Sequence, residues 1–165
     1  MDLFEYQGKS LYQKFNINHP NSKLIKNLND LNDPINLNFP VVVKAQVQVG
    51  GRGKAGGIKV AKDINELTQY SEEILGMDIK GHKVEILLLE EASNILEEYY
   101  ISFTLDRSEK KYLIMLSAKG GMDIEQVAEE NPDDLVKFHV SPSEKLTSST
   151  ISELINKANL NKDHE

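Results

Sequence analysis

The sequence predicts an α+β fold, because strand-like and helix-like patterns are mixed along its 165 residues. Two apolar runs, at residues 41–47 and 58–61, flank a glycine-rich loop and indicate a pair of strands. Two further runs, at 99–105 and 111–118, flank a polar turn and predict a β-hairpin. Apolar residues at helical spacing near the N-terminus predict a helix as well.

The first helix is expected from about Leu3 to Phe15, where apolar side chains fall near one face. Residues 16–40 are rich in Asn, Asp and Pro, a composition that favours turns and short elements. Behind Asp63, whose side chain can cap it, a helix is expected over 64–75. The remaining elements are expected as a buried strand at 84–89, the hairpin, a helix at Asp123–Glu130, a strand at 136–140 and a helix at 150–158.

The most informative segment is 40–61, which sets a lysine in an apolar strand and then joins glycines to two cations in a loop. The glycines lack a Cβ, so the backbone can turn sharply and bring N–H groups close to phosphate oxygens; they are Gly50, Gly51, Gly53, Gly56 and Gly57. Arg52 and Lys54 add charge-assisted donors, and Lys44 would reach the same phosphates from the strand. The pattern predicts a site for a nucleotide triphosphate.

Two common nucleotide motifs fit this loop poorly. The glycines match the dinucleotide fingerprint formally, but residues 58–61 predict a strand where that motif needs a helix. The P-loop pattern fails because Ala55, not Ser or Thr, follows Lys54. What remains is a glycine-rich hairpin that can fold over phosphates like a lid. The alternative is a solvent-exposed basic hairpin without a ligand.

Composition excludes several classes of function. The formal net charge of −7 argues against nucleic acid as a partner, because binding to a phosphate backbone needs an extended basic face. The absence of cysteine excludes disulfides, thiolate catalysis and Cys-zinc sites, and the four histidines have no metal-ligand spacing. The N-terminus lacks a secretory pattern and no apolar run approaches the roughly 20 residues of a membrane span. We therefore expect a cytoplasmic protein of bacterial or archaeal type.

An ordered set of motifs covers the chain from Met1 to about Pro142. They are Glu5-Tyr-Gln-Gly-Lys9, Val43-Lys-Ala-Gln-Val47, Gly50-Gly-Arg-Gly-Lys-Ala-Gly-Gly57, Leu89-Glu90, Asp106-Arg-Ser108 and Gly120-Gly-Met-Asp-Ile-Glu125. The combination resembles the N-terminal, ATP-grasp region of the β subunit of succinate–CoA ligase, also called succinyl-CoA synthetase. Related acyl-CoA ligases such as malate–CoA ligase share these motifs, so the enzyme class is better defined than the acid.

The resemblance implies an ATP-grasp fold that is incomplete in this chain. Residues 18–93 would form the small lobe with its phosphate loop at 50–57, and residues 1–17 and 94–165 would belong to a truncated larger lobe. The full enzyme would convert succinate, CoA and ATP to succinyl-CoA, ADP and phosphate, reversibly, through a phosphohistidine on the partner α subunit. ATP is favoured over GTP by Pro20 in the family's base-specificity region.

Carried over residue by residue, the resemblance implies a nucleotide site and no catalytic residue in this chain. The nucleotide-binding residues would be Lys44, Gly51, Arg52, Gly53, Glu90, Ser93 and Glu98. From the sequence alone, an acidic cluster such as that around Glu90 and Glu98 is more often a solvated edge, and it is the resemblance that favours a nucleotide-binding role for these two residues. The Mg²⁺ ligands and the domain that meets CoA and succinate are expected beyond residue 165. The chain would then be a fragment, inactive alone, and a non-catalytic nucleotide-binding or subunit-interaction module is the alternative of another class.

Overall fold

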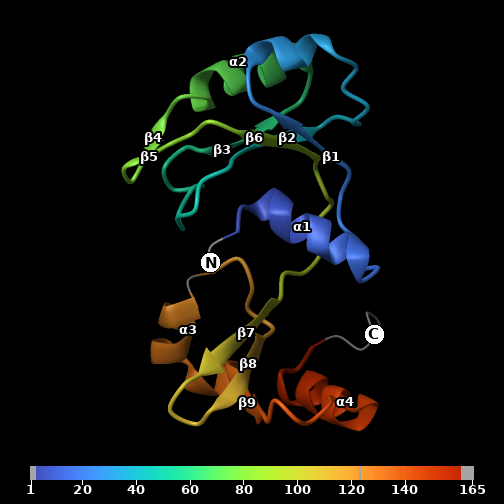
Figure 1. The fold of residues 1–165 in the computed structure, drawn as a ribbon, viewed down its shortest axis with the longest axis vertical. Helices are drawn as coiled ribbons and strands as arrows, with labels where there is room; N and C mark the ends of the chain where they lie inside the picture. The colour runs from blue at the N-terminus through green and yellow to red at the C-terminus, as the bar shows by residue number, and fades with distance from the viewer. Residues whose placement is uncertain (1–2, 123, 161–165) are drawn as a thin grey trace. The chain divides into compact units, whose positions relative to one another are not determined.

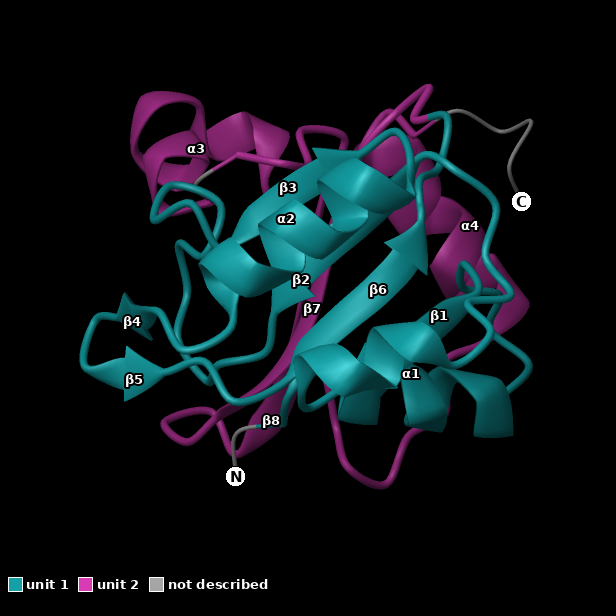
Figure 2. Cartoon of the chain, turned by 90° about the horizontal axis from the view of Figure 1, so that it is seen from above, with its two compact units in different colours: residues 1–94 teal, residues 95–165 magenta. Residues whose placement is uncertain are grey.

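The computed structural model describes residues 3–122 and 124–160, and it divides the chain into two compact units. The first unit comprises residues 1–94 and the second residues 95–165 (Figures 1 and 2). The mixture of helices and antiparallel strands confirms the predicted α+β class.

The first unit is built on a four-stranded antiparallel sheet. In spatial order its strands are β1 (Ser22–Ile25), β6 (Leu87–Glu91), β2 (Val41–Ala45) and β3 (Ile58–Ala61). Burial alternates along β2, where Val41, Val43 and Ala45 are fully buried while Val42 and Lys44 are half-buried. Because side chains alternate across a strand, Lys44 lies on the face opposite this part of the core.

Helix α2 (Ile64–Ile74) packs on the apolar face of this sheet (Figure 2). The expected cap is confirmed, since Asp63 Oδ1 accepts hydrogen bonds from Asn65 N at 2.8 Å and Glu66 N at 3.0 Å. Leu67 and Ile74 of α2 are completely buried with the inward side chains of β2 and β6. This is the main hydrophobic core of the unit.

Helix α1 (Glu5–Lys14) lies on the other side of the sheet from α2 (Figure 1). It begins two residues later than expected, where Gln7 Oε1 accepts a hydrogen bond from Phe4 N at 2.9 Å. None of its residues, all within the described part of the chain, is fully buried, and Leu11 is 41% exposed. Buried Gln46, the residue after β2, links α1 to the sheet, because Gln46 Oε1 accepts a hydrogen bond from Tyr6 N at 3.2 Å.

Two features of the first unit differ from the sequence prediction. The strand expected at 84–89 is β6 and starts only at Leu87, because Val84 pairs instead with the segment after α2: its N–H donates to Met77 O and its carbonyl accepts from Gly76 N, each at 2.8 Å. The sequence also did not predict the bounds of some short elements. These are the 3₁₀ turn η1 (Leu28–Asn32) and the two strands of a hairpin, β4 (Asp78–Ile79) and β5 (His82–Lys83). The β4–β5 turn uses Lys80 and Gly81, both with positive φ.

The second unit has a three-stranded antiparallel sheet in the order β7 (Tyr100–Asp106), β8 (Lys111–Ser117), β9 (Val136–Val140). The hairpin and β9 confirm the sequence prediction. Its other elements are α3 (Ile124–Glu130), η2 (Pro132–Asp134) and α4 (Ser148–Lys157). Asp123, where the third helix was expected to begin, lies outside the described residues.

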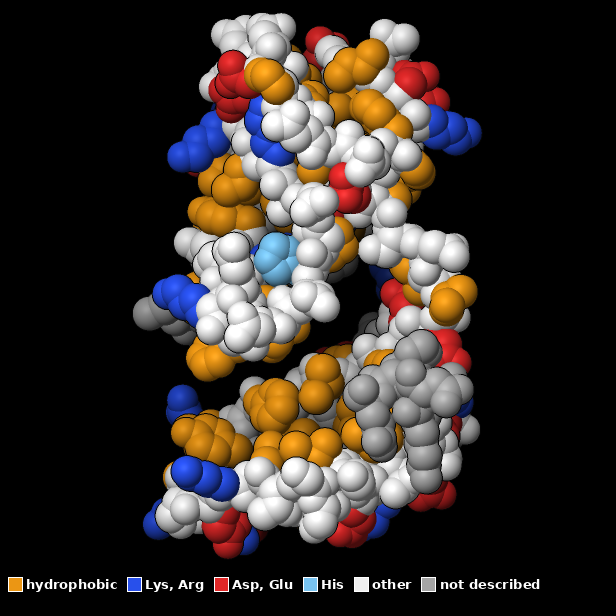
Figure 3. Space-filling view, turned by 90° about the vertical axis from the view of Figure 1, so that its right-hand side faces the viewer, with side chains coloured by type: hydrophobic (Ala, Val, Ile, Leu, Met, Phe, Trp, Pro, Cys, Tyr) orange, Lys and Arg blue, Asp and Glu red, His pale blue; other side chains and the backbone are white. Residues whose placement is uncertain are grey.

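The second unit has a small hydrophobic core and further hydrophobic side chains on its surface. Leu154 of α4 is buried with Ile114, Leu116 and Val140 of the sheet. Other hydrophobic side chains gather on its surface (Figure 3). Ile101, Phe103 and Leu105 of β7 are each more than half exposed. Within the described residues, no helix combines the length and apolar character that crossing a membrane requires.

Candidate functional site

Four charged side chains form a closed ring of alternating sign on the face of the sheet that α1 covers. Lys44 Nζ of β2 lies 2.6 Å from Glu90 Oε1 and 3.1 Å from Glu5 Oε1. Lys9 Nζ of α1 contacts Glu90 Oε2 and lies 3.6 Å from Glu5 Oε1. Each lysine therefore faces both carboxylates, and each carboxylate faces both lysines.

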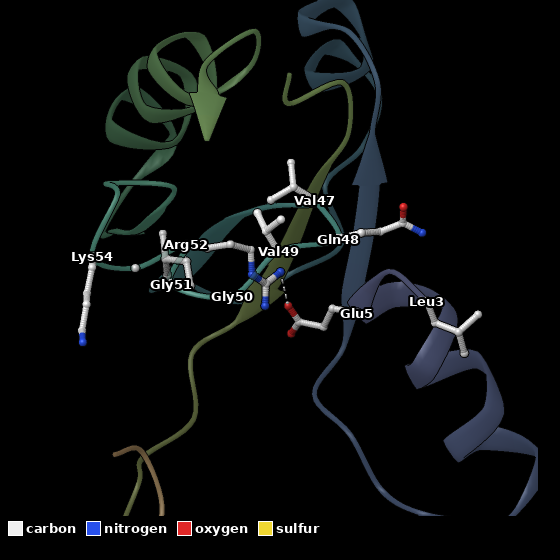
Figure 4. A pocket seen from close by; sticks show the side chains of 11 residues that line it. Leu3, Glu5, Val47, Gln48, Val49, Gly50, Gly51, Arg52 and Lys54 are labelled. Carbon is white, nitrogen blue, oxygen red and sulfur yellow. Dashed lines mark ion pairs between the residues drawn. The ribbon is translucent and has the colours of Figure 1, made fainter. Parts of the chain in front are cut away.

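Arg52 of the glycine loop attaches to this ring through Glu5. Its Nη1 lies 3.0 Å from Glu5 Oε2 (Figure 4) and donates a hydrogen bond to Ala45 O at 2.9 Å. Since Ala45 follows Lys44 on β2, this bond holds the guanidinium beside the end of the strand. Counting Lys9, Lys44 and Arg52 against Glu5 and Glu90, the cluster carries one net positive charge at neutral pH.

The cluster is substantially shielded from solvent. The side chain of Glu90 is 7% exposed and that of Lys9 13%, compared with 21% for Glu5. Burial of charges is tolerated in proteins when each one is paired, as it is here. Glu90 is thus the fixed anion of the ring, while Glu5, on a helix without a fully buried residue, is the more accessible one.

The pKa values of the α1 groups follow from this environment. Burial alone would raise the pKa of Glu5, but the charges of Lys44, Arg52 and Lys9 and the hydrogen bond from Lys44 together hold it below its usual value. Burial and repulsion from Lys44 lower the pKa of Lys9, and Glu5 opposes this shift. Glu5 therefore remains an anion at neutral pH.

The glycine loop between β2 and β3 is folded by its own backbone. Gly57 N donates to Arg52 O at 2.8 Å and Ala55 N donates to Gly51 O at 3.1 Å. Gly51 has a φ of +82°, a conformation that favours glycine. A Cβ on Gly57 would lie 2.6 Å from Ile79 Cδ1 and 3.2 Å from Arg52 O, so a larger residue there would force its neighbours to shift.

A pocket of about 580 Å³ opens beside this loop (Figure 4). Its volume lies within the range of about 300–1,000 Å³ that is typical of small-molecule sites. Its lining comprises Leu3, Glu5, Val47, Gln48, Val49, Gly50, Gly51, Arg52, Gly53, Lys54 and Ile58. Arg52 points toward Glu5, whereas Lys54 points away from both in Figure 4. Of the two loop cations, only Arg52 joins the charged cluster.

The predicted site residues are distributed over both units. Lys44, Arg52 and Glu90 meet at the cluster, and Gly51 and Gly53 line the adjoining pocket. Ser93 is exposed at the end of the first unit.

Glu98 is exposed in the second unit, where it lies against a pair of glycines. Gly120 N donates to Glu98 O at 2.8 Å. A Cβ on Gly120 would lie 2.6 Å from Tyr99 N and 2.7 Å from Glu98 O, so only glycine allows this approach. The role predicted for Glu98 at the nucleotide stays a prediction.

Sequence reasoning assigned no role to three charged residues around this site: Glu5, Lys9 and Lys80. The first two were detectable, because an acid and a base four residues apart share one face of a helix, but their partners on the sheet depend on tertiary structure. Lys80, at the β4–β5 turn, donates from Nζ to Gly50 O at 2.9 Å and so supports the glycine loop. No local pattern links Lys80 to residue 50.

Among the described residues, no group of three or more His, Asp or Glu side chains is arranged so that it could hold a metal ion. Glu5 and Glu90 are neutralised by lysine and arginine side chains. These carboxylates therefore do not fit as Mg²⁺ ligands, which prefer oxygen donors free of competing cations.

Comparison with curated proteins gives a consistent set of relatives. The chain is 45% identical over 144 residues to the succinate–CoA ligase [ADP-forming] subunit beta of Halorubrum lacusprofundi, covering 87% of this chain and 38% of that protein. It is 48% identical over 140 residues to the subunit of the same name from Methanocaldococcus jannaschii, covering 85% of this chain and 38% of the relative. The predicted resemblance is confirmed, and the chain spans about two fifths of the length of these relatives.

Solved structures share the fold. An acetyl-coenzyme A synthetase of Candidatus Korarchaeum cryptofilum superposes with a TM-score of 0.74 at 23% identity, covering 93% of this chain and 65% of that one. ATP citrate lyase from Methanothrix soehngenii superposes with a TM-score of 0.65 at 21% identity, covering 95% of this chain and 42% of that one. The ATP-grasp domain model matches residues 2–165. The chain belongs to the ATP-grasp domain family.

Proposed function

We propose that this chain is the nucleotide-binding part of an ADP-forming succinate–CoA ligase β subunit. The observation that carries the proposal is the convergence of Lys44 and Arg52 on one carboxylate, Glu5, at the edge of a glycine-lined pocket. Two cations that share one anionic partner are spaced to share a phosphate group as well. The relatives named as succinate–CoA ligase subunits support the choice of enzyme.

In this proposal the chain contributes electrostatics rather than a reacting group. Lys44 and Arg52 would neutralise charge on the β- and γ-phosphates of ATP, and the amides of Gly51 and Gly53 would add uncharged donors. Glu90 would act by positioning, because its carboxylate fixes Lys44 from the neighbouring strand. The phosphohistidine would belong to the α subunit, which we propose as the partner.

The remaining assignments follow the same proposal. Ser93 would lie at the hinge between the lobes and Glu98 near the ribose, with lobes at 18–93 and at 1–17 plus 94–165. Mg²⁺ would be held by groups outside the cluster of Glu5 and Glu90. CoA and succinate would bind to the complete complex, in the cytoplasm.

Calorimetry with Mg-ATP and with adenosine tests the nucleotide site in this chain directly. We expect ATP to bind and adenosine to bind far more weakly, because Lys44 and Arg52 would bind the phosphates, which adenosine lacks. Arg52→Ala should weaken ATP binding, and it should also lower the melting temperature, because it removes the ion pair with Glu5 and the hydrogen bond to Ala45 O. Equal affinity of wild type and Arg52→Ala would contradict the proposal.

The acid substrate requires the complete enzyme. A full-length β subunit combined with its α subunit should form acyl-CoA from succinate in preference to malate and other dicarboxylates. Preference for malate would favour the malate–CoA ligase alternative. If ATP binds but no acid is activated, the chain would instead be a non-catalytic nucleotide-binding or subunit-interaction module.

A further inference from the structure

Glu5 lies where a phosphate ligand of Lys44 and Arg52 would lie. Its two oxygens contact the two cations separately, Oε1 with Lys44 at 3.1 Å and Oε2 with Arg52 at 3.0 Å. It also lines the pocket beside the glycine loop. An anionic ligand that engages both cations must compete with this carboxylate.

The contacts of Glu5 are weaker than those of the other carboxylate in the ring. Lys44 Nζ is 2.6 Å from Glu90 but 3.1 Å from Glu5. Among the described residues, neither Glu5 Oε2 nor Glu90 Oε2 accepts an aligned hydrogen bond, so the two carboxylates differ in contact distance and in exposure, which is 21% for the Glu5 side chain and 7% for that of Glu90. Removing a carboxylate from its cations costs less when its contacts are longer and it is more exposed to solvent. Of the two carboxylates, Glu5 is therefore the one that a ligand displaces at lower cost.

A second cationic partner for Glu5 is already in place. Lys9 lies one helical turn along α1, with its Nζ 3.6 Å from Glu5 Oε1, the longest contact of the ring. A rotation of the Glu5 side chain toward Lys9 would shorten this contact while releasing Lys44 and Arg52. Lys9 keeps Glu90 as its other partner, so no buried charge is left unpaired.

We infer that Glu5 is an exchangeable internal counter-ion, which holds Lys44 and Arg52 in the ligand-free protein and moves to Lys9 when a phosphate ligand takes its place; this rests on the proposed nucleotide site. Glu5 keeps the cations apart and pre-arranged when the site is empty. Lys9 assists ligand binding from a distance, by receiving the displaced carboxylate. Both are positioning residues and neither contacts the ligand.

The test measures binding of Mg-ATP and of tripolyphosphate, which lacks the base and ribose, by calorimetry on the 165-residue chain. Glu5→Gln should tighten both by about 5- to 30-fold, because the competing anion is gone. The same variant should lower the melting temperature of the ligand-free protein, since its three cations lose a partner. Tighter binding together with lower stability is the signature of a displaced counter-ion.

Lys9→Met is the second variant in this binding experiment. It should weaken tripolyphosphate binding when Glu5 is present and have little effect in the Glu5→Gln background, because no carboxylate then needs a second partner. Equal weakening in both backgrounds would mean that Lys9 binds phosphate directly, and would overturn the inference. The matched control is Glu73→Gln, which breaks the Lys59–Glu73 ion pair elsewhere in the same unit and should leave binding unchanged.

The outcomes separate this inference from the proposed function. If wild type binds ATP but Glu5→Gln binds equally or more weakly, the counter-ion role is wrong and the nucleotide site stands. If neither protein binds ATP or tripolyphosphate, both are wrong. Should Glu5→Gln fail to fold, Glu5→Asp serves instead, because its carboxylate is one methylene shorter and should also bind tripolyphosphate more tightly than wild type.

Discussion

Lys44 on β2 and Glu90 on β6 are diagonal neighbours on one face of the first unit's sheet, with Nζ and Oε1 2.6 Å apart. The register explains this, because Lys44 is paired with Leu88 and Val42 with Glu90 across the two strands. Residues two apart on a strand point to the same face. A slip of one residue would place Glu90 in the apolar face under α2, so the hydrophobic core enforces the geometry of the charged cluster.

Lys44→Ala should weaken ATP binding by roughly 10- to 150-fold, the effect of losing a charge-assisted contact of about 1.5–3 kcal/mol. Lys44→Arg should also lose affinity, because the planar guanidinium is longer and cannot reproduce the contacts of an ammonium group held between Glu5 and Glu90. Calorimetry with Mg-ATP measures both. Unchanged affinity in Lys44→Ala would exclude the proposed phosphate contact.

Lys59→Ala is the matched control for this experiment. Lys59 lies on the adjacent strand β3 and is also paired with a glutamate, Glu73 of α2. The substitution removes a strand lysine and its ion pair from the same sheet, at a residue that does not itself line the pocket. It should leave ATP affinity within twofold of wild type, as expected for a lysine that does not contact the ligand.

Trypsin should cleave the glycine loop after Lys54 in preference to Arg52. Lys54 is exposed, whereas Arg52 is half-buried and its Nη1 is bound to Ala45 O. Mg-ATP should slow the cleavage if the loop closes on phosphates, because proteolysis requires local opening. Mass spectrometry of the fragments over time, with and without ATP, measures this. Equal rates in both samples would count against a phosphate lid.

Local patterns in the sequence were sufficient to predict the strands around the glycine loop and α2 with its Asp63 cap. Alternating apolar residues, glycine clusters and capping residues act over a few positions, and they reappear at 58–61 and 64–74 almost unchanged. The start of β6 was misplaced because Val84 is as apolar as the strand that follows. The backbone of Val84 is hydrogen-bonded to Gly76 and Met77. These partners are set by tertiary structure and cannot be predicted from the residues next to Val84 in the sequence.

The candidate site was likewise only partly predictable from the sequence. Lys44 and Arg52 were found because they stand within or beside the glycine loop in the sequence. Glu5 and Lys9 act on them from 35 or more positions away, and their role depends on α1 lying over the polar face of the sheet. The charge pairing of the cluster therefore emerges only with the fold.

Gly57→Ala should destabilise the protein by about 1–3 kcal/mol, because the new Cβ would lie 2.6 Å from Ile79 Cδ1 and 3.1 Å from Ala45 Cβ in a packed region. Gly53→Ala has only Ile58 Cδ1 at 4.0 Å from its Cβ and should fold normally. Urea unfolding measures both. If the loop backbone approaches phosphates, Gly53→Ala should nevertheless weaken ATP binding, and wild-type affinity in that variant would argue against such an approach.

The contribution of Glu5 to stability should be lost in acid. Its pKa is held below the usual value of 4.5 in the folded protein, against its burial, by Lys44 and Arg52 together with Lys9. The folded state therefore binds a proton less readily than the unfolded state, so the stability that Glu5 supplies is fully present above about pH 4.5 and falls as the pH drops through the folded pKa. Wild type should consequently unfold at higher urea concentration than Glu5→Gln at pH 7 and at pH 5. The difference should shrink between pH 4.5 and pH 3, whereas Glu85→Gln, exposed in the same unit, should show no comparable gap at pH 7. A gap between wild type and Glu5→Gln that is absent at pH 7, or that widens in acid, would contradict the assigned ion pairs.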